Sequence, residues 1–332
     1  MRDFQRDVVT AALAGKPLPS SVFSWSTGRH NLFSFCRRAY FLRYYLAQGG
    51  WNEFAHPLAK TAYLEKHLPT FSGWQSNTFG ASVTAALAEA SRMDRIHLRI
   101  RSFQNLLLKN MQKSITDLQE SLLRKSYLQD PKLPGFLEYY HEEPGFLEKD
   151  TDVFIERLLR AFATGYAVLL DSDFMEIVGG NTYTGYRFYA KPFIEIPRKS
   201  FSVWLKAGAV YTRKGSLNML RFTNAEETKE LAFARSVDAD LWNQYVWSKN
   251  PFAEAELNTF FFSEKSAEFL KAPSPISSEE WIHDSVQTML SHVDSDGMVR
   301  AESFPKTEDT DRCRTCSFRH SCARLSDAIH KI

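Results

Sequence analysis

The four cysteines are the feature of this 332-residue chain that most constrains how it can fold. Cys36 stands alone near the start, whereas Cys313, Cys316 and Cys322 lie close together near the end, in the spacing C-x276-C-x2-C-x5-C. Four thiolates are a suitable ligand set for a tetrahedral zinc ion or for an iron–sulfur cluster. If all four bind one centre, they close most of the chain into a ring. The spacing therefore predicts a fold whose two ends meet.

Disulfide bonds and four unrelated thiols are the other interpretations of this pattern. Residues 1–15 are charged and have no hydrophobic signal core, and no apolar run approaches the roughly 18 residues of a membrane span, so we expect a cytoplasmic protein with no membrane partner. A chain of this length with four cysteines is also not a small disulfide scaffold. Unrelated thiols would explain Cys36 but not the dense spacing of the other three. A cluster is our first prediction, and zinc is the alternative, in which His320 could replace one thiolate.

Arginine is concentrated in the same two stretches as the cysteines. Residues 29–45 and residues 312–324 contain no acidic residue, and each stretch carries four arginines. These candidate DNA-binding residues are Arg29, Arg37, Arg38, Arg43, Arg312, Arg314, Arg319 and Arg324. If the cysteines meet, the arginines surround one point, and their charge suits the phosphates of a nucleic acid. An ordinary solvated surface is the alternative interpretation.

Hydrophobic periodicity predicts mostly helices in the first half of the chain and a set of strands in the second. We expect helices over 32–45, 53–68, 79–93, 94–125, 152–170, 228–248 and 277–293, strands over 174–178, 183–196, 200–212, 216–223 and 257–262, and a final loop that carries three cysteines. This order predicts a mixed α/β fold. We divide the one integrated fold into an N-terminal helical part with the first cysteine (1–75), a helical region (76–170), a sheet core (171–265) and a C-terminal helix with the cysteine tail (266–332).

The contexts of the cysteines resemble one family, the iron–sulfur branch of the PD-(D/E)XK nuclease superfamily. This branch includes the AddB-type helicase–nuclease subunits and the Cas nucleases of CRISPR spacer acquisition. The resemblance rests on Phe33-Ser-Phe-Cys36-Arg-Arg-Ala-Tyr40 and on Cys313-Arg-Thr-Cys316-Ser-Phe318-Arg-His-Ser-Cys322, preceded by Phe304-Pro-Lys-Thr. It extends over the whole chain but is specific at the two ends. It implies a restriction-endonuclease-like core sheet flanked by helices, a helical insertion, a [4Fe–4S] cluster that joins the N- and C-terminal segments, and DNA as ligand or substrate.

The middle of the chain departs from the family pattern at the positions that cut DNA. Active members carry two metal-binding acids and a lysine on two neighbouring strands, and many carry a histidine in an early helix. The pattern places Thr84 at the histidine, Ala209 at the first acid, Arg221 at the second acid and Thr223 at the lysine. These residues cannot hold Mg²⁺ or Mn²⁺, and Arg221 would repel the ion. We therefore expect a catalytically inactive protein, in which Arg221 holds a phosphate without cutting it.

Three hypotheses about function follow. The favoured one is an inactive, DNA-binding subunit that works with a helicase or effector in DNA repair, recombination or defence against foreign DNA. The second is an active Mg/Mn-dependent exo- or endonuclease whose site has been rebuilt from Glu176, Glu195 and Lys206. The third is a cluster-stabilised protein-interaction module that does not touch nucleic acid.

Overall fold

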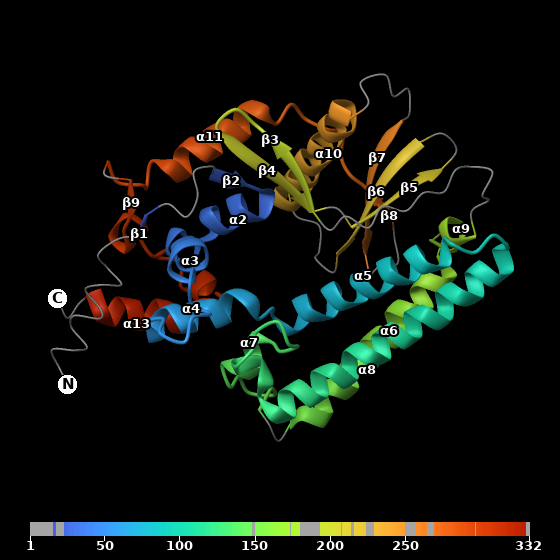
Figure 1. Ribbon diagram of the computed structural model, residues 1–332, viewed down its shortest axis with the longest axis horizontal. Helices are drawn as coiled ribbons and strands as arrows, with labels where there is room; N and C mark the ends of the chain where they lie inside the picture. The colour runs from blue at the N-terminus through green and yellow to red at the C-terminus, as the bar shows by residue number, and fades with distance from the viewer. Residues whose placement is uncertain are drawn as a thin grey trace.

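The computed structural model describes residues 16–17, 23–147, 150–172, 174–179, 193–206, 208–213, 216–223, 229–249, 256–263, 269–295 and 297–329. Helices and strands both contribute to it, which confirms the mixed α/β class (Figure 1). Two hydrophobic cores organise these elements. The first core surrounds the two ends of the chain, and the second lies in an arm of long helices.

The first core draws on both ends of the chain. Its N-terminal elements are β2 (Phe23–Trp25), α2 (Thr27–Phe35), α3 (Arg37–Phe41), the π-helix Leu42–Leu46 and α4 (Pro57–His67). Its later elements are β3 (Phe193–Pro197), β4 (Phe201–Lys206), α10 (Lys229–Lys249), α11 (Glu279–Leu290), the 3-10 helix Ala301–Ser303 and α13 (Arg319–Ile329). The strand β4 lies between β2, to which it is parallel, and β3, to which it is antiparallel. The predicted regions 1–75 and 266–332 thus share one core.

The second core fills the helical arm. The arm consists of α5 (Phe71–Ala90), α6 (Ile96–Arg124), α8 (Thr151–Asp171) and α9 (Phe174–Val178), with the 3-10 helix Ser126–Leu128 and α7 (Leu137–Tyr140) toward one end. The long helix α6 buries Phe103, Leu107 and Met111, which recur every four residues. Such spacing places them on one face of a helix, as the sequence predicted for this segment.

A four-stranded sheet separates the two cores. Its order is β5 (Ala209–Arg213), β6 (Ser216–Thr223), β7 (Leu257–Ser263) and β8 (Phe269–Lys271), in which β6 and β7 are parallel and the two outer pairs are antiparallel. Successive side chains of a strand point to opposite faces. Met219 of β6 therefore packs in the first core and Leu220 in the second.

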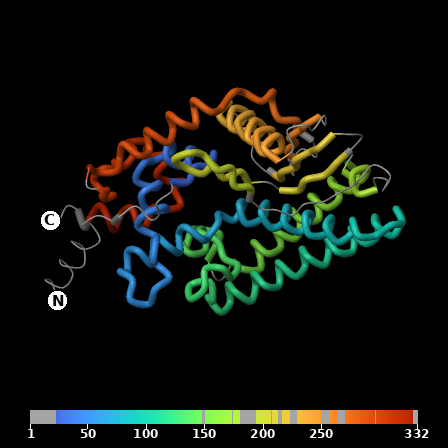
Figure 2. Tube along the Cα trace, turned by 45° about the horizontal axis from the view of Figure 1, so that its top comes forward, coloured from blue at the N-terminus to red at the C-terminus, as the bar shows by residue number. Residues whose placement is uncertain are grey.

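The two ends of the chain meet, as the cysteine spacing predicted. The short strand β1 (Lys16–Pro17) pairs antiparallel with β9 (Met298–Val299). Helix α13 lies against α4, where Arg324 Nη1 donates to Thr61 Oγ1 over 3.1 Å. In both ribbon and tube views the blue N-terminal segments lie beside the red C-terminal ones (Figure 2).

The structure corrects two predictions about secondary structure. Residues 174–178 form helix α9 rather than a strand, because Phe174, Ile177 and Val178 reach the second core together at helical spacing. The cysteine tail is helical rather than a loop, with α12 (Thr310–Arg314) preceding α13. Of the predicted strand over 183–196, residues 183–192 lie outside the described part of the chain.

Two predicted elements are real but interrupted. The helix expected over 32–45 breaks at Cys36, whose backbone is extended (φ −163°, ψ 119°), so that this residue ends α2 and caps α3. The strand expected over 200–212 divides into β4 and β5. Gly208 lies at this division, where an added Cβ would be only 2.3 Å from the Leu220 carbonyl oxygen. The chain can pass this close to β6 because glycine has no side chain.

We expect Gly208→Ala to destabilise the protein by about 1–3 kcal/mol, because the new methyl group would collide with backbone that cannot move freely. Gly28→Ala is the matched control. Gly28 is exposed in α2 with nothing within 4 Å of an added Cβ, so this change should stabilise the protein by up to about 1 kcal/mol. Urea unfolding measures both changes. Equal stability of the two variants would contradict the proposed close approach at Gly208.

Candidate metal centre and cationic cavities

All four cysteines line one cavity where the ends of the chain meet. Cys36 lies between α2 and α3, Cys313 is in α12, Cys316 follows α12, and Cys322 is in α13. The cavity has a volume of about 210 Å³. Cys36 is buried, and the other three cysteines are partly buried. The fold thus brings the four predicted residues to one cavity, but no three of their sulfur atoms lie mutually within 4.8 Å.

Backbone contacts hold the two cysteine segments together. The Arg38 backbone N–H donates to the Pro305 carbonyl over 3.2 Å, and Arg38 Nε donates to the Phe304 carbonyl over 2.7 Å. In the opposite direction, Arg312 Nη1 donates to the carbonyls of Ser34 and Phe35 over 3.2 Å each. Two arginines from the two stretches thus each bridge to the backbone of the other end.

Burial acts on the pKa values of two of the thiols, and the charge of Arg38 acts in the opposite direction on that of Cys322. Burial raises the pKa of Cys316 to about 12, and burial also raises the pKa of Cys322, while the nearby Arg38 opposes that rise. A metal bound here would have to displace the protons that burial favours on Cys316 and Cys322. Burial lowers the pKa of Arg38 itself, against the opposing effect of Cys322 and Cys36. Arg38 is thus a buried positive group set among the cysteines.

The possible metal-ligand atoms of the cysteines are more widely spaced than those of a second group, Glu65, His141 and His320. Across the described residues, one set of three ligand atoms lies mutually within 4.8 Å, and it consists of Glu65, His141 and His320 rather than cysteines. Four sulfurs around one zinc at about 2.3 Å would lie only about 3.8 Å apart. The cysteine cavity is therefore wider than a single tetrahedral ion requires.

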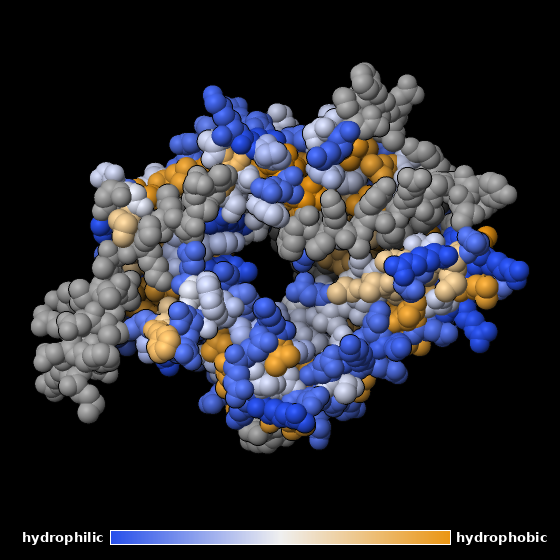
Figure 3. All heavy atoms as spheres, in the orientation of Figure 1, coloured by the Kyte–Doolittle hydropathy of each residue, from blue (hydrophilic) through white to orange (hydrophobic). Residues whose placement is uncertain are grey.

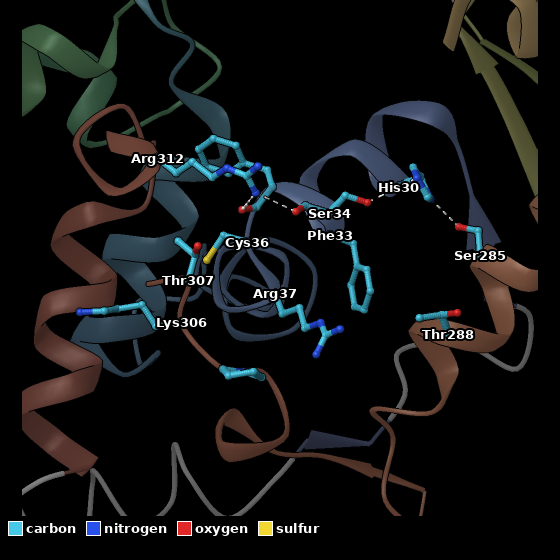
Figure 4. A pocket seen from close by; sticks show the side chains of 12 residues that line it. His30, Phe33, Ser34, Cys36, Arg37, Ser285, Thr288, Lys306, Thr307 and Arg312 are labelled. Atoms are coloured by element: carbon cyan, nitrogen blue, oxygen red, sulfur yellow. Dashed lines mark hydrogen bonds between the residues drawn. The ribbon is translucent and has the colours of Figure 1, made fainter. Parts of the chain in front are cut away.

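A larger cavity adjoins the cysteines on the other side of Cys36. Its volume is about 420 Å³, and its described lining carries Arg37, Lys306 and Arg312 but no acidic residue. Figure 4 shows the Arg37 side chain pointing into it, beside Phe33 and Cys36. Arg37 and Lys306 have no ion-pair partner among the residues that the structure describes. This cavity can accept an anion.

The eight predicted arginines have different surroundings. Arg29 and Arg38 are buried: Arg29 donates to Ser24 and lies over the Tyr44 ring, 4.1 Å from its centroid. Their guanidinium groups make intramolecular contacts, which removes them from a DNA-facing surface. The arginines of α12 and the start of α13 have acidic partners, in the pairs Arg312–Asp309, Arg314–Asp311 and Arg319–Glu143. Arg324 contacts Thr61, and Arg43 Nη1 donates to the Lys66 carbonyl over 3.2 Å.

Arg43 belongs to a group of cations for which no offsetting acid is found among the residues that the structure describes. Burial, followed by the charges of Arg43 and Arg29, lowers the pKa of Lys66. Burial and then Lys66, Arg43 and Lys132 lower the pKa of His67. In the described part of the chain, the charged neighbours that shift these two pKa values are all positive. Such a concentration of like charge favours binding of an anion.

A third cavity is lined by Thr84 and Arg221, two of the four positions at which the family pattern expects catalytic residues. It has a volume of about 370 Å³ between α5 and the sheet, and Thr84, Lys206, Gly208 and Arg221 line it. Ala209 is fully buried beside it in β5, and Thr223 ends β6 with its side chain outside the described part. Its described lining contains no carboxylate. In the space-filling view, an opening with hydrophilic borders lies between the parts that carry α2 and α10 and those that carry α4 and α5 (Figure 3).

Arg221 already has an anionic partner within the protein. Its guanidinium is hydrogen-bonded to Asp238 of α10, and Asp238 also accepts from Thr27 Oγ1 over 3.0 Å. The Asp238 side chain is 6% exposed. An unpaired carboxylate buried to this extent would be costly, so Arg221 serves first to neutralise Asp238. Lys206 remains as the cation of this cavity, with Nζ 3.3 Å from Asn77 Oδ1, and burial and then Arg221 lower the pKa of Lys206.

The residues considered for a rebuilt catalytic site do not line this cavity together. Glu176 lies on helix α9, not on a strand, and Glu195 on β3 accepts a hydrogen bond from Ser202 Oγ over 2.7 Å. Only Lys206 of the three is among the described residues around the cavity. A single lysine provides no ligand set for magnesium or manganese.

Sequence reasoning missed several residues of these sites. Glu65, His141 and Asp238 come from separate helices whose proximity depends on the tertiary fold. No spacing rule links residues 65, 141 and 320. Lys306 could have been found, because it directly follows the Phe304-Pro lead-in to the cysteine tail.

Comparisons with known proteins give no family for the chain. No protein-family model matches it, and no curated protein matches it. A solved structure described as the crystal structure of SSO0001 matches with a TM-score of 0.28 and 12% sequence identity, covering 60% of this chain and 93% of that one. A TM-score of this size does not establish a common fold. Among the described helices, none combines the length and apolar character that crossing a membrane requires.

We expect Arg221→Met to destabilise the protein by roughly 2–4 kcal/mol, because it leaves the buried Asp238 without its counter-charge. Adding Asp238→Asn should recover part of the loss, since asparagine carries no charge and can still accept from Thr27. Arg92→Met is the control, because it breaks an exposed pair with Glu89 and should cost less than about 1 kcal/mol. Urea unfolding of the wild type and the three variants gives the comparison. No recovery in the double variant would contradict this role of Arg221.

Proposed function

We propose that this chain is a DNA-binding protein with a degenerate PD-(D/E)XK nuclease fold, in which Cys36, Cys313, Cys316 and Cys322 hold a [4Fe–4S] cluster. It would act in the cytoplasm as a subunit beside a helicase or effector in DNA repair, recombination or defence against foreign DNA. The observation that carries the proposal is that two neighbouring cavities have lining residues in common. Cys36, Lys306 and Arg312 line both the cysteine cavity and the larger cationic cavity. A centre bound by the cysteines would fix the backbone that presents cations to DNA.

The arrangement of the cysteine cavity is compatible with the proposed cluster. The thiols surround one cavity but are not gathered as closely as a single ion requires. A four-iron cluster is larger, because each thiolate binds a different iron. Arg38 would offset part of the negative charge that four thiolates bring to such a cluster.

The lining of the third cavity supports a nuclease-like core that no longer cleaves DNA. The resemblance requires an early helix and two neighbouring strands around one site, and α5, β5 and β6 supply these elements. Thr84 and Arg221 line the cavity, and Ala209 is adjacent to its Gly208. Metal-dependent cleavage needs carboxylates at this place, and the described lining has none. Arg221 is paired with Asp238, so Lys206 takes the role of phosphate contact that the sequence suggested for Arg221.

DNA contact is assigned to the cations that the protein leaves without acidic partners. These are Arg37 and Lys306 beside the cysteines, the group formed by Arg43 and Lys66, and Lys206 in the third cavity. Phosphate binding by such groups needs no base readout, so the proposed binding is insensitive to DNA sequence. Buried Arg29 and Arg38 are not part of this surface.

The cluster can be tested with two neighbouring arginines. Protein purified anaerobically should be brown, with absorbance near about 400 nm and bound iron. Arg38→Met should lower the iron content, because it removes the buried charge and the bond to Phe304, whereas Arg37→Met should not. Cys313→Ser serves as the positive control for loss. Bound zinc without iron in the wild-type protein would exclude the cluster.

DNA binding can be tested by charge reversal. Arg37→Glu with Lys66→Glu should weaken binding about tenfold or more and reduce the slope of log K against log salt by about 2, that is by about 1 for each phosphate that is no longer neutralised. The matched control is Lys109→Glu with Lys113→Glu, an equal charge change on the exposed face of α6. No weakening by either pair would favour the interaction-module hypothesis, whereas equal weakening by both pairs would contradict the assignment of DNA contact to these cations.

The same preparations test whether cutting is lost. We expect no cleavage of single- or double-stranded DNA with Mg²⁺ or Mn²⁺. Cleavage that disappears in Glu195→Ala or Lys206→Ala would instead establish the active-nuclease hypothesis with its rebuilt site.

A further inference from the structure

Glu65, His141 and His320 form a compact buried group that neither the cysteine centre nor the DNA surface uses. They come from α4, from the end of α7 and from α13. The side chains of Glu65 and His141 are 0% and 2% exposed. One ligand atom from each of the three residues lies within 4.8 Å of the others. The group therefore joins the N-terminal part, the helical arm and the cysteine tail.

The distances within the group suit a divalent metal. His141 Nε2 and Glu65 Oε1 are 3.2 Å apart. Two ligands bound to one zinc at about 2.0 Å in tetrahedral geometry are separated by about 3.3 Å, which is close to this value. The ring centroids of His141 and His320 are 4.2 Å apart. The His320 ring nitrogens have no hydrogen-bond partner among the residues that the structure describes, so one is free to bind an ion.

The surroundings hold the carboxylate in place. The backbone N–H groups of His320 and Ser321 donate to Glu65 Oε1 and Oε2, each over 3.2 Å, at the start of α13. Supporting hydrogen bonds of this kind orient metal ligands. The neighbouring positive charges are engaged elsewhere, Arg319 with Glu143 and Arg324 with Thr61.

We propose that Glu65, His141 and His320 bind one divalent ion of the zinc class, which fastens the helical arm and α4 to the cysteine-bearing helix α13. Two imidazoles and one carboxylate are borderline ligands that suit Zn²⁺ better than Mg²⁺ or Ca²⁺. The role is structural, since the ligands come from three separate segments and two of the side chains are buried. The inference does not depend on the proposed function, because none of its residues is a cysteine or a DNA contact.

Elemental analysis of the intact protein tests the site. Chains produced with ZnCl₂ and dialysed anaerobically should retain one zinc each, in addition to any iron. His141→Gln should weaken zinc binding about tenfold or more, since removing a ligand costs at least as much as removing its support. Glutamine can still donate a hydrogen bond to Glu65, so the fold should survive. The control is His97→Gln, an exposed histidine on α6, which should keep the zinc.

The outcomes separate this site from the cysteine centre. Iron content reports the cysteines and should be unchanged in His141→Gln. If the cysteines hold zinc instead of iron, the wild-type zinc content rises to two per chain, and His141→Gln still loses one. Equal zinc in wild type and His141→Gln would overturn the proposal and leave the three residues as a hydrogen-bonded network.

Discussion

The rest of the structure depends on the contact between the segment around Cys36 and the C-terminal tail. Closing a loop of this length costs on the order of 5 kcal/mol of chain entropy. Apolar packing offsets that cost, because the fully buried Phe304 ring lies 5.6–6.1 Å from the rings of Phe41, Tyr45 and Tyr40. Hydrogen bonds from Arg38 to the backbone of the tail then fix the register of the two segments. The cysteine cavity is thus assembled by packing, and a bound centre would add to a junction that already exists.

This junction also determines where the sheet and the helical arm can meet. The first core holds β4, and the chain passes directly from β4 into β5 at Gly208. Helix α5 approaches the same sheet closely, because Gly80 leaves room for the Phe222 ring, which an added Cβ would meet at 3.0 Å. These two glycines bring Lys206 and Arg221 to one cavity. The third cavity is therefore positioned by the close approach of α5 to the sheet at Gly80 and of the chain to β6 at Gly208, and not by its polar side chains.

Local patterns in the sequence predicted the mixed fold, the long helix α6 and the meeting of the cysteines. They failed where tertiary contacts decide the outcome. Phe174–Val178 has the composition of a strand but packs as helix α9, and the arginine-rich tail becomes helical partly because the distant Glu65 caps α13. A count of charges also could not separate Arg37 from Arg38. Both belong to one basic run, yet one is exposed and the other is 8% exposed and bonded to Phe304.

The pairing of Arg221 with Asp238 shows how a buried carboxylate next to the third cavity is neutralised by a side chain of the protein itself. A carboxylate as buried as Asp238 needs a nearby positive charge, and either a divalent cation or a guanidinium can supply it. A guanidinium does so without open coordination positions, so it cannot activate water. Under the proposed function, Arg221 would neutralise Asp238, which is not among the described residues that line the cavity, and would offer no position for a metal-bound water. Restoring a metal would require removal of the arginine together with new carboxylates on β5 and β6, because Asp238 alone offers too few ligands.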